Sequence, residues 1–275
     1  MNSSYTSRRA LLNRFVGSAA GAIAGSILLK PAALAQSTGA SELSAPETRR
    51  VTDVIDGNGL HLDGGEEMHL LAIEAPALEK NGFAELASAG RAALAAAIGN
   101  QPITLRYDAI RRDRYGRRLA HAFTADGLWL QAELVKEGLA RVHGDSRNRY
   151  GLRKLMAIEA DARAQKSGIW RHSAFVVRSG TDAALETLSG SFQLVEGKVV
   201  ESAIAKGMGY LNFGPDHATD LTLVLNKPAL AAAEAATIDV AGLAGKRIRC
   251  RGWIESFDGP RIEATYPEQI EALEN

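Results

Sequence analysis

Five arginines lie close together in the sequence, in a segment expected to turn at Gly116. They are Arg111, Arg112, Arg114, Arg117 and Arg118, and Tyr115 lies among them. A guanidinium offers forked N–H donors that match two phosphate oxygens at once, and glycine tolerates the backbone of a tight turn. The cluster therefore predicts a phosphate-binding or nucleic-acid-binding hairpin. The alternative is a solvated, arginine-rich surface loop.

Two segments upstream of the arginines carry further signals. Residues 54–59 are a tight-turn signal between two alternating strands, and residues 70–76 are a buried strand that ends at a proline. Together with residues 113–117, these segments resemble the thermonuclease family, whose fold is that of staphylococcal nuclease. The resemblance covers roughly residues 49–170 and includes the helical segment 129–140.

The resemblance implies a set of functional positions. Thermonucleases use a calcium ion, two arginines and a glutamate to cleave a phosphodiester. Matched motif by motif, Asn58 and Glu74 stand at the metal-ligand positions, His69 and Arg117 at the arginine positions, and Ala77 at the general-base position. Of these five, only Glu74 and Arg117 keep the chemistry that the family uses.

The three substitutions predict impaired catalysis. Calcium is held more weakly as carboxylates are removed, and loss of a positioned general base costs about 10²–10⁴ in rate. An imidazole at His69 does not reproduce the bidentate grip of arginine. We therefore expect a thermonuclease-like protein without efficient hydrolysis and without a cofactor, calcium being used only if the family site functions. It would bind single-stranded nucleic acid, another polyanion or a protein partner.

Two other functions stay open. The chain could be an active calcium-dependent phosphodiesterase, an endonuclease on DNA or RNA, if Glu79 or His69 replaces the missing groups. We favour the simpler interpretation that Glu79 is a solvated carboxylate before a helix and that His69 fills space on a strand. The remaining alternative is a structural module that binds an envelope protein, with the arginines as surface charge.

The N-terminal residues 1–35 predict export. The pair Arg8-Arg9 resembles a twin-arginine motif, the apolar stretch 15–29 follows, and Ala35 ends a signal-peptidase site. This stretch is shorter than the ~20 residues that span a bilayer as a helix, so we expect cleavage after Ala35 and no stable membrane anchor afterwards. The expected location is periplasmic or secreted.

Charge, cysteine and histidine content narrow the partners further. The whole chain has 32 basic and 32 acidic residues, and removal of the four basic residues in segment 1–35 leaves 28 against 32, or minus four. Any contact with a polyanion must therefore be local. Cys250 is the only cysteine, so no intramolecular disulfide forms, and it is expected to be buried. The six histidines show no zinc-ligand spacing.

The elements expected along the chain predict an α+β fold, a β-barrel with helices. A signal peptide (1–35) and a flexible lead-in (36–47) precede a thermonuclease-like OB-fold barrel (48–175), and a linker (176–190) leads to a second, smaller OB-like barrel (191–275). In the first barrel, strands are expected at 50–55, 59–62, 67–73, 103–107 and 118–123, and helices at 83–98, 130–136 and 152–166. In the second, strands are expected at 192–203, 208–213, 220–225, 246–255 and 261–265, and a helix at 228–236.

The strand expected at 246–255 has two contrasting faces. Period-two alternation places Arg247, Arg249, Arg251 and Trp253 on one face and apolar residues such as Cys250 on the other. The basic face could stack a base and pair with phosphates, or it could be the solvated outside of a barrel.

Overall fold

A computed structural model of the chain describes residues 43–77 and 82–273. The signal peptide expected at 1–35, most of the lead-in, and Glu79 lie outside the described residues. No helix in the described part is both long and apolar enough to cross a membrane.

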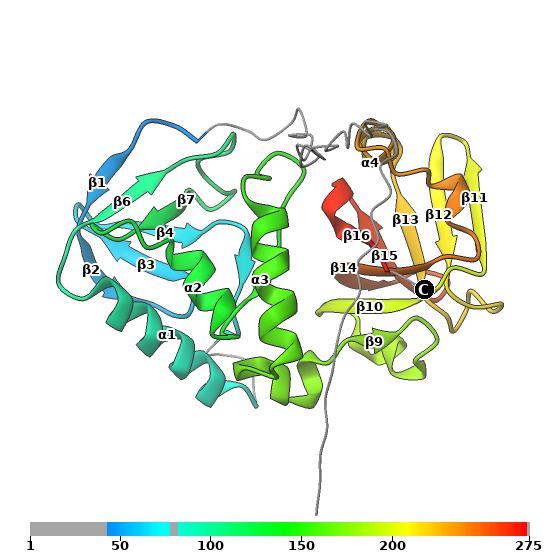
Figure 1. Cartoon of the computed structure of the whole chain (residues 1–275), viewed down its shortest axis with the longest axis horizontal. Helices are drawn as coiled ribbons and strands as arrows, with labels where there is room; N and C mark the ends of the chain where they lie inside the picture. The colour runs from blue at the N-terminus through cyan, green and yellow to red at the C-terminus, as the bar shows by residue number, and fades with distance from the viewer. Residues whose placement is uncertain (1–42, 78–81, 274–275) are drawn as a thin grey trace, which may run out of the picture. The chain divides into compact units, whose positions relative to one another are not determined.

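The first sheet closes into a five-stranded barrel (Figure 1). β1 and β2 are separated only by Arg50 and act as one strand, whose first half pairs with β6 and whose second half pairs with β3. The sheet order is β1-β6-β7-β4-β3-β2, with the β4–β7 pair parallel and the others antiparallel. The strands are β1 (Glu47–Arg49), β2 (Val51–Val54), β3 (Gly59–Leu62), β4 (Glu66–Leu70), β6 (Ile103–Arg106) and β7 (Arg118–Phe123).

Apolar side chains fill this barrel at alternate strand positions. Leu60 and Leu62 of β3, Met68 of β4, and Ile103 and Leu105 of β6 are almost fully buried. The spacing of two residues sends these side chains to one face, which is the period expected of a strand with one buried face. The barrel interior is therefore a packed hydrophobic core.

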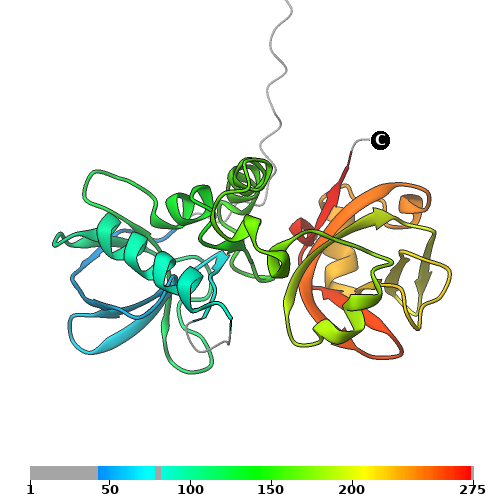
Figure 2. The same ribbon diagram turned by 90° about the horizontal axis from the view of Figure 1, so that it is seen from below.

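Helices and a short sheet cover the first barrel. Helix α1 (Ala84–Ile98) buries Ala87, Gly90, Leu94 and Ile98 at helical spacing, so one face of the helix packs inward. Figure 2 shows α1 lying across the front of the curved strands. The other elements are α2 (Leu130–Lys136), α3 (Leu152–Ala164) and the antiparallel pair β5 (Ile73–Glu74) and β8 (Arg141–Val142).

The second sheet repeats the topology of the first. Its path is β11-β12-β13-β15-β14-β10-β9, with β13 and β15 parallel as β4 and β7 are, and β16 added beside β14. The expected fold class, an α+β protein with OB-like barrels, is confirmed. The elements are β10 (Phe192–Lys198), β11 (Glu201–Ala205), β12 (Met208–Asn212), β13 (Thr222–Leu225), α4 (Lys227–Ala235), β14 (Arg247–Ser256), β15 (Pro260–Ala264) and β16 (Ile270–Ala272).

Two segments of the second half differ from the expectation. The strand expected at 192–203 is interrupted between β10 and β11, because the Val199 amide bonds to Lys246 beside β14 whereas the Val200 amide bonds to Asn212 in β12. Residues 176–190, expected as a linker, contain β9 (Arg178–Ser179), which pairs with β10. Leu185 in this segment is fully buried in the second core, so the segment is part of the second barrel's packing.

Residues of the second barrel also complete the first. The Tyr266 ring is buried within the first core, and its hydroxyl accepts a hydrogen bond of 3.0 Å from the Gly144 amide. Burial raises the pKa of Tyr266 to about 12. Arg149 donates two hydrogen bonds, of 2.9 and 2.7 Å, to the Glu268 carboxylate. The two barrels are thus expected to unfold together.

A buried histidine is expected to make the fold sensitive to acid. His121 is 1% exposed, and burial lowers its pKa from 6.5 to about 4. Because the folded pKa lies below the unfolded one, the unfolded chain binds the proton first, and stability is lost as the pH falls from about 6.5 toward 4.

We therefore expect His121 alone to reduce the free energy of unfolding by about 2 kcal/mol between pH 7 and 4.5. Urea unfolding of the natural protein and of His121→Phe at both pH values measures this contribution by difference. An equal loss of stability in both proteins would contradict it.

Candidate functional site

The turn at residues 56–59 is built by one carboxylate and one glycine. The Asp56 Oδ1 atom accepts hydrogen bonds from the amides of Asn58 (2.9 Å) and Gly59 (2.6 Å). A Cβ atom on Gly57 would lie 2.7 Å from the Ala75 Cβ, so only glycine fits there. The carbonyl of Asn58 accepts from the Leu70 amide at 2.8 Å, which fixes the turn against the end of β4.

His69 and Arg117, the two positions where the family has arginine, lie against each other. Both come from the parallel β4–β7 region, where His69 is in register with Leu119. The His69 Nε2 atom and an Arg117 terminal nitrogen are 2.8 Å apart. Burial and the neighbouring guanidinium lower the pKa of His69, so a neutral imidazole that accepts a hydrogen bond from Arg117 accounts for the contact.

Asp113 holds the other side of Arg117. The Arg117 Nε atom donates to the Asp113 carboxylate at 2.7 Å, and the Arg117 amide donates to the same carboxylate at 3.0 Å. Burial would raise the pKa of Asp113, but the hydrogen bonds from Arg117 and from the backbone lower it. Arg117 is thus fixed between a carboxylate and an imidazole. A phosphate would have to displace or share these partners.

The candidate metal positions supply few oxygen ligands. Glu74 ends β5, and its Oε2 lies 3.9 Å from the Nδ1 of His143, whose pKa burial lowers to about 4. Ala77 follows on the same segment and has no ionisable group. Within the described ranges, no three His, Cys, Asp or Glu side chains are grouped to hold a metal ion. With an amide at Asn58 and one carboxylate at Glu74, this donor set does not fit calcium well.

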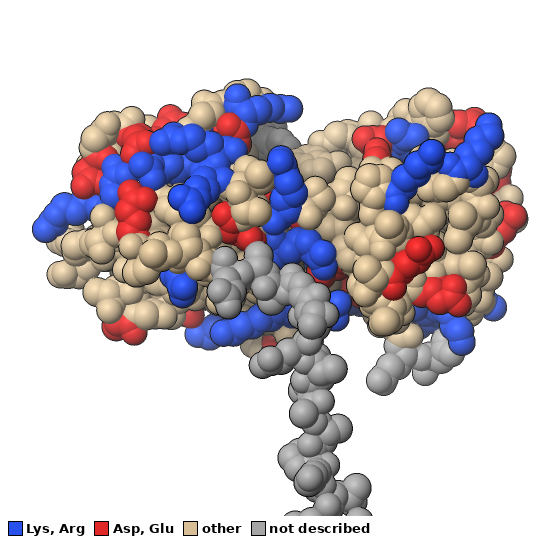
Figure 3. Space-filling view, turned by 90° about the horizontal axis from the view of Figure 1, so that it is seen from above, with Lys and Arg blue, Asp and Glu red and all other residues tan. Residues whose placement is uncertain are grey.

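Much of the arginine cluster is neutralised by carboxylates. Arg112 and Arg118 both bind Glu66, at 2.7 and 2.8 Å, and Arg118 also reaches Glu47 at 3.1 Å. The hydrogen bonds from Arg118, Arg112 and then Arg49 hold the pKa of Glu66 far below its usual range. Figure 3 shows basic side chains of the first barrel gathered on one face with acidic ones beside them. This network joins β1, β4 and β7 and stabilises the barrel wall.

The remaining members of the cluster contact aromatic rings. The Arg114 guanidinium lies 4.8 Å from the centre of the Tyr115 ring, and Arg117 lies 5.2 Å from the same ring. Arg111 lies 5.4 Å from the Tyr107 ring. Tyr115 is 67% exposed. Among the described residues, Arg111 and Arg114 form no salt bridge, so they and Tyr115 are the members best placed to receive a phosphate and a base.

One member of the basic face expected in β14, Arg251, is an internal contact, whereas Arg247 and Trp253 are exposed. Arg251 is 1% exposed and its guanidinium lies 2.9 Å from Glu159 of α3 and 2.6 Å from Glu271 of β16. It also donates to the Val142 carbonyl at 3.1 Å. Of the two interpretations left open for this face, phosphate binding or a solvated barrel exterior, neither describes Arg251. On the opposite face, Cys250 is fully buried as expected.

Sequence reasoning missed the carboxylates that surround these arginines. For Asp113 a signal was available, since it lies four residues before Arg117. For Glu47, Glu66 and Glu159 the partners lie on elements distant in the chain. Strand pairing brings Glu47 and Glu66 to Arg118, and packing of helix α3 against β14 brings Glu159 to Arg251.

Comparison with known proteins supports the resemblance. Residues 67–172 match the family described as Staphylococcal nuclease homologue. The chain is 36% identical over 77 residues to Endonuclease YncB of Bacillus subtilis (strain 168), an alignment that covers 28% of this chain. It spans only 36% of the length of that relative. The family match includes His69, Glu74, Ala77 and Arg117 and begins after the turn at Asn58. The chain thus carries, at residues 67–172, a domain of the staphylococcal nuclease, or thermonuclease-like, family.

Proposed function

We propose that this chain is an exported thermonuclease-like protein that binds single-stranded nucleic acid on its first barrel and cleaves it inefficiently or not at all. The observation that carries the proposal is the pairing of Arg117 with Asp113 at 2.7 Å and with His69 at 2.8 Å. One of the two guanidinium positions is an imidazole, and the other guanidinium is held by internal partners. The export part of the proposal rests on the sequence of residues 1–35 alone.

The metal and base positions support the same conclusion. Thermonuclease-like proteins depend on calcium, and here Asn58 and Glu74 together offer one carboxylate where the family has two. Ala77 offers no proton acceptor. A phosphodiester bound here would therefore meet little metal charge and no positioned base.

Nucleic-acid binding is proposed for the exposed arginines of the hairpin. Arg111 and Arg114 lie next to aromatic rings, and Tyr115 offers an exposed face on which a base can stack. Arg112 and Arg118 are left out of the proposed site because each already binds the Glu66 carboxylate. The site is thus smaller than the five-arginine cluster in the sequence.

An active endonuclease is the second candidate, and the similarity to Endonuclease YncB favours it. In that case His69 would act as a base or a phosphate ligand. Its lowered pKa keeps the imidazole neutral and able to accept a proton at neutral pH. The two candidates differ in whether the unmodified protein cuts nucleic acid.

The hairpin assignment predicts a specific loss of binding. Arg111→Ala/Arg114→Ala should weaken binding of a labelled oligo-dT by about tenfold at low salt and flatten the slope of log affinity against log salt by about 1.4, because two phosphate contacts are lost. Fluorescence anisotropy over a salt series measures both quantities. Arg171→Ala/Lys246→Ala removes the same charge from two exposed positions elsewhere and should leave binding nearly unchanged. Equal weakening by both double variants would mean that the hairpin is not the site.

A further inference from the structure

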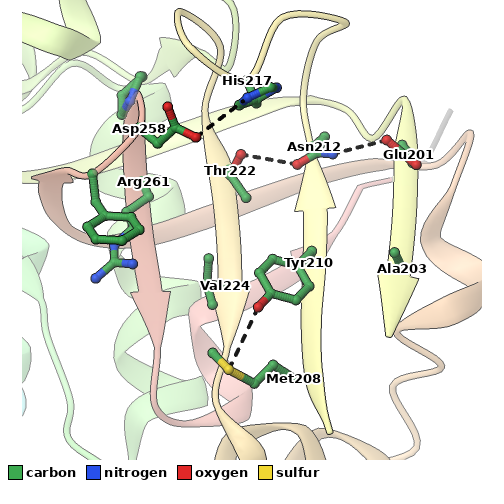
Figure 4. A pocket seen from close by; sticks show the side chains of 12 residues that line it. Glu201, Ala203, Met208, Tyr210, Asn212, His217, Thr222, Val224, Asp258 and Arg261 are labelled. Carbon is green, nitrogen blue, oxygen red and sulfur yellow. Dashed lines mark hydrogen bonds and ion pairs between the residues drawn. The ribbon is translucent and has the colours of Figure 1, made fainter. Parts of the chain in front are cut away.

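The outer face of the second barrel contains a pocket unrelated to the first barrel's arginines. It has a volume of about 380 Å³, within the range of about 300–1,000 Å³ that small-ligand pockets occupy. Neighbouring strands β11, β12 and β13 supply alternate residues to it, so its floor is the face of the sheet opposite the core (Figure 4). The loop between β14 and β15 forms one wall.

The wall is held in place by close packing between two loops. A Cβ atom on Gly259 would lie 2.0 Å from the His217 carbonyl oxygen, so the β14–β15 loop touches the loop before β13 directly. His217 and Asp258 face each other across this contact, with Nε2 and Oδ2 3.6 Å apart. Contacts within the protein therefore set the position of this wall.

One end of the pocket is apolar and aromatic. Ala203, Met208 and Val224 surround the Tyr210 ring, and the Tyr210 hydroxyl lies 3.7 Å from the Met208 sulfur (Figure 4). An aliphatic stem or a flat ring can lie against this floor and remove apolar surface from water.

The other end is polar and carries negative charge. Asn212 donates to the Glu201 carboxylate at 3.2 Å and accepts from the Thr222 hydroxyl at 3.1 Å, and Asp258 lies across the pocket from this row (Figure 4). Among the described lining residues, Arg261 is the one guanidinium. It is already bound to Glu255 at 2.8 Å and packed over the Phe257 ring at 4.5 Å.

This charge pattern decides which ligands fit. Glu201 and Asp258 present one carboxylate at each side of the pocket, with β12 and β13 between them, and the Arg261 guanidinium is neutralised by its own partner. A phosphate chain would be repelled by either carboxylate, whereas an ammonium group would be attracted to either one, and its apolar stem can lie against the Tyr210 ring.

We propose that this pocket binds an organic cation, an ammonium group on an apolar stem, as found in a free polyamine or in a lysine side chain. The stem lies on the Tyr210 and Met208 floor and an ammonium group binds the Glu201 carboxylate, while a second ammonium group of a polyamine can bind Asp258 at the other side. The pocket is thus a second binding site, and its cationic ligand is opposite in charge to the nucleic acid proposed for the first barrel.

The test is isothermal titration of the full chain with spermidine and, in a second arm, with the tripeptide Gly-Lys-Gly. We expect at least one of them to bind saturably, and the one that binds identifies the source of the ammonium group. The affinity should fall about tenfold in Glu201→Gln/Asp258→Asn and about fivefold in Tyr210→Ala. Glu234→Gln removes a carboxylate from exposed α4 and should change nothing. Thermal unfolding checks that the variants are folded.

Two results would overturn the proposal. The first is that neither ligand binds the natural protein, or that the natural protein and the carboxylate double variant bind with equal affinity. The other is displacement of spermidine from the natural protein by oligo-dT, with oligo-dT binding lost in Tyr210→Ala. Oligo-dT binding at Arg111 and Arg114 is measured separately, so failure of the nucleic-acid proposal and failure of the cation-pocket proposal give different results.

Discussion

Replacing Arg251 with alanine is expected to destabilise the protein by about 3–5 kcal/mol. The substitution leaves the fully buried Glu159 and the neighbouring Glu271 without their shared cation. Burial would lower the pKa of Arg251, but the two carboxylates raise it above its usual range, so the guanidinium is charged in the fold. Single domains have about 5–15 kcal/mol of stability, so this loss is a large fraction of the total.

Urea unfolding followed by tryptophan fluorescence measures the effect. Lys136→Ala is the control. Lys136 pairs with Glu133, three residues earlier on α2, and this exposed pair is expected to contribute no more than about 1 kcal/mol to stability. A loss for Arg251→Ala as small as that of the control would show that the buried cluster contributes little to the free energy of unfolding.

The second large effect is a gain of activity. The triple variant Asn58→Asp/His69→Arg/Ala77→Glu should cut single-stranded DNA in the presence of calcium at least about 10²-fold faster than the natural protein. The barrel and Arg117 are already in place, and the three changes restore ligand charge, the second guanidinium and the base. Because groups that act as one unit are strongly non-additive, each single reversion should give little.

The matched control carries the same triple change plus Arg117→Ala. It should return to background, because Arg117, one of the two guanidinium groups of the restored site, is then absent. If the triple variant stays inactive while thermal unfolding shows it to be folded, the three positions do not account for the loss of activity.

The sequence predicted the barrels well because their signals are local. β3, β7 and α2 have the bounds expected from alternating or helical apolar residues, and α1 and α3 differ by one or two residues at their ends. In each half, three strands, a helix and two more strands follow one another along the chain, and this order predicts the strand pairing of an OB barrel.

The sequence could not predict which charged groups are internal. Arg251 shares a face of β14 with the exposed Arg247 and Trp253, yet residues of α3 and β8 contact its guanidinium and bury it. The cluster around Arg118 looked like free positive charge, because Glu47 and Glu66 come from strands far away in the chain. Alternation identifies the face of a strand, whereas what covers that face depends on tertiary packing.

The most direct test is digestion of labelled single-stranded DNA by the unmodified protein, at saturating enzyme, with calcium or with chelator. The pairing of Arg117 with His69 and the single carboxylate at Glu74 predict cleavage near background under both conditions, while anisotropy shows the DNA bound. Calcium-dependent cleavage at a rate comparable to that of the triple variant would contradict the account. His69 would then be the first residue to replace.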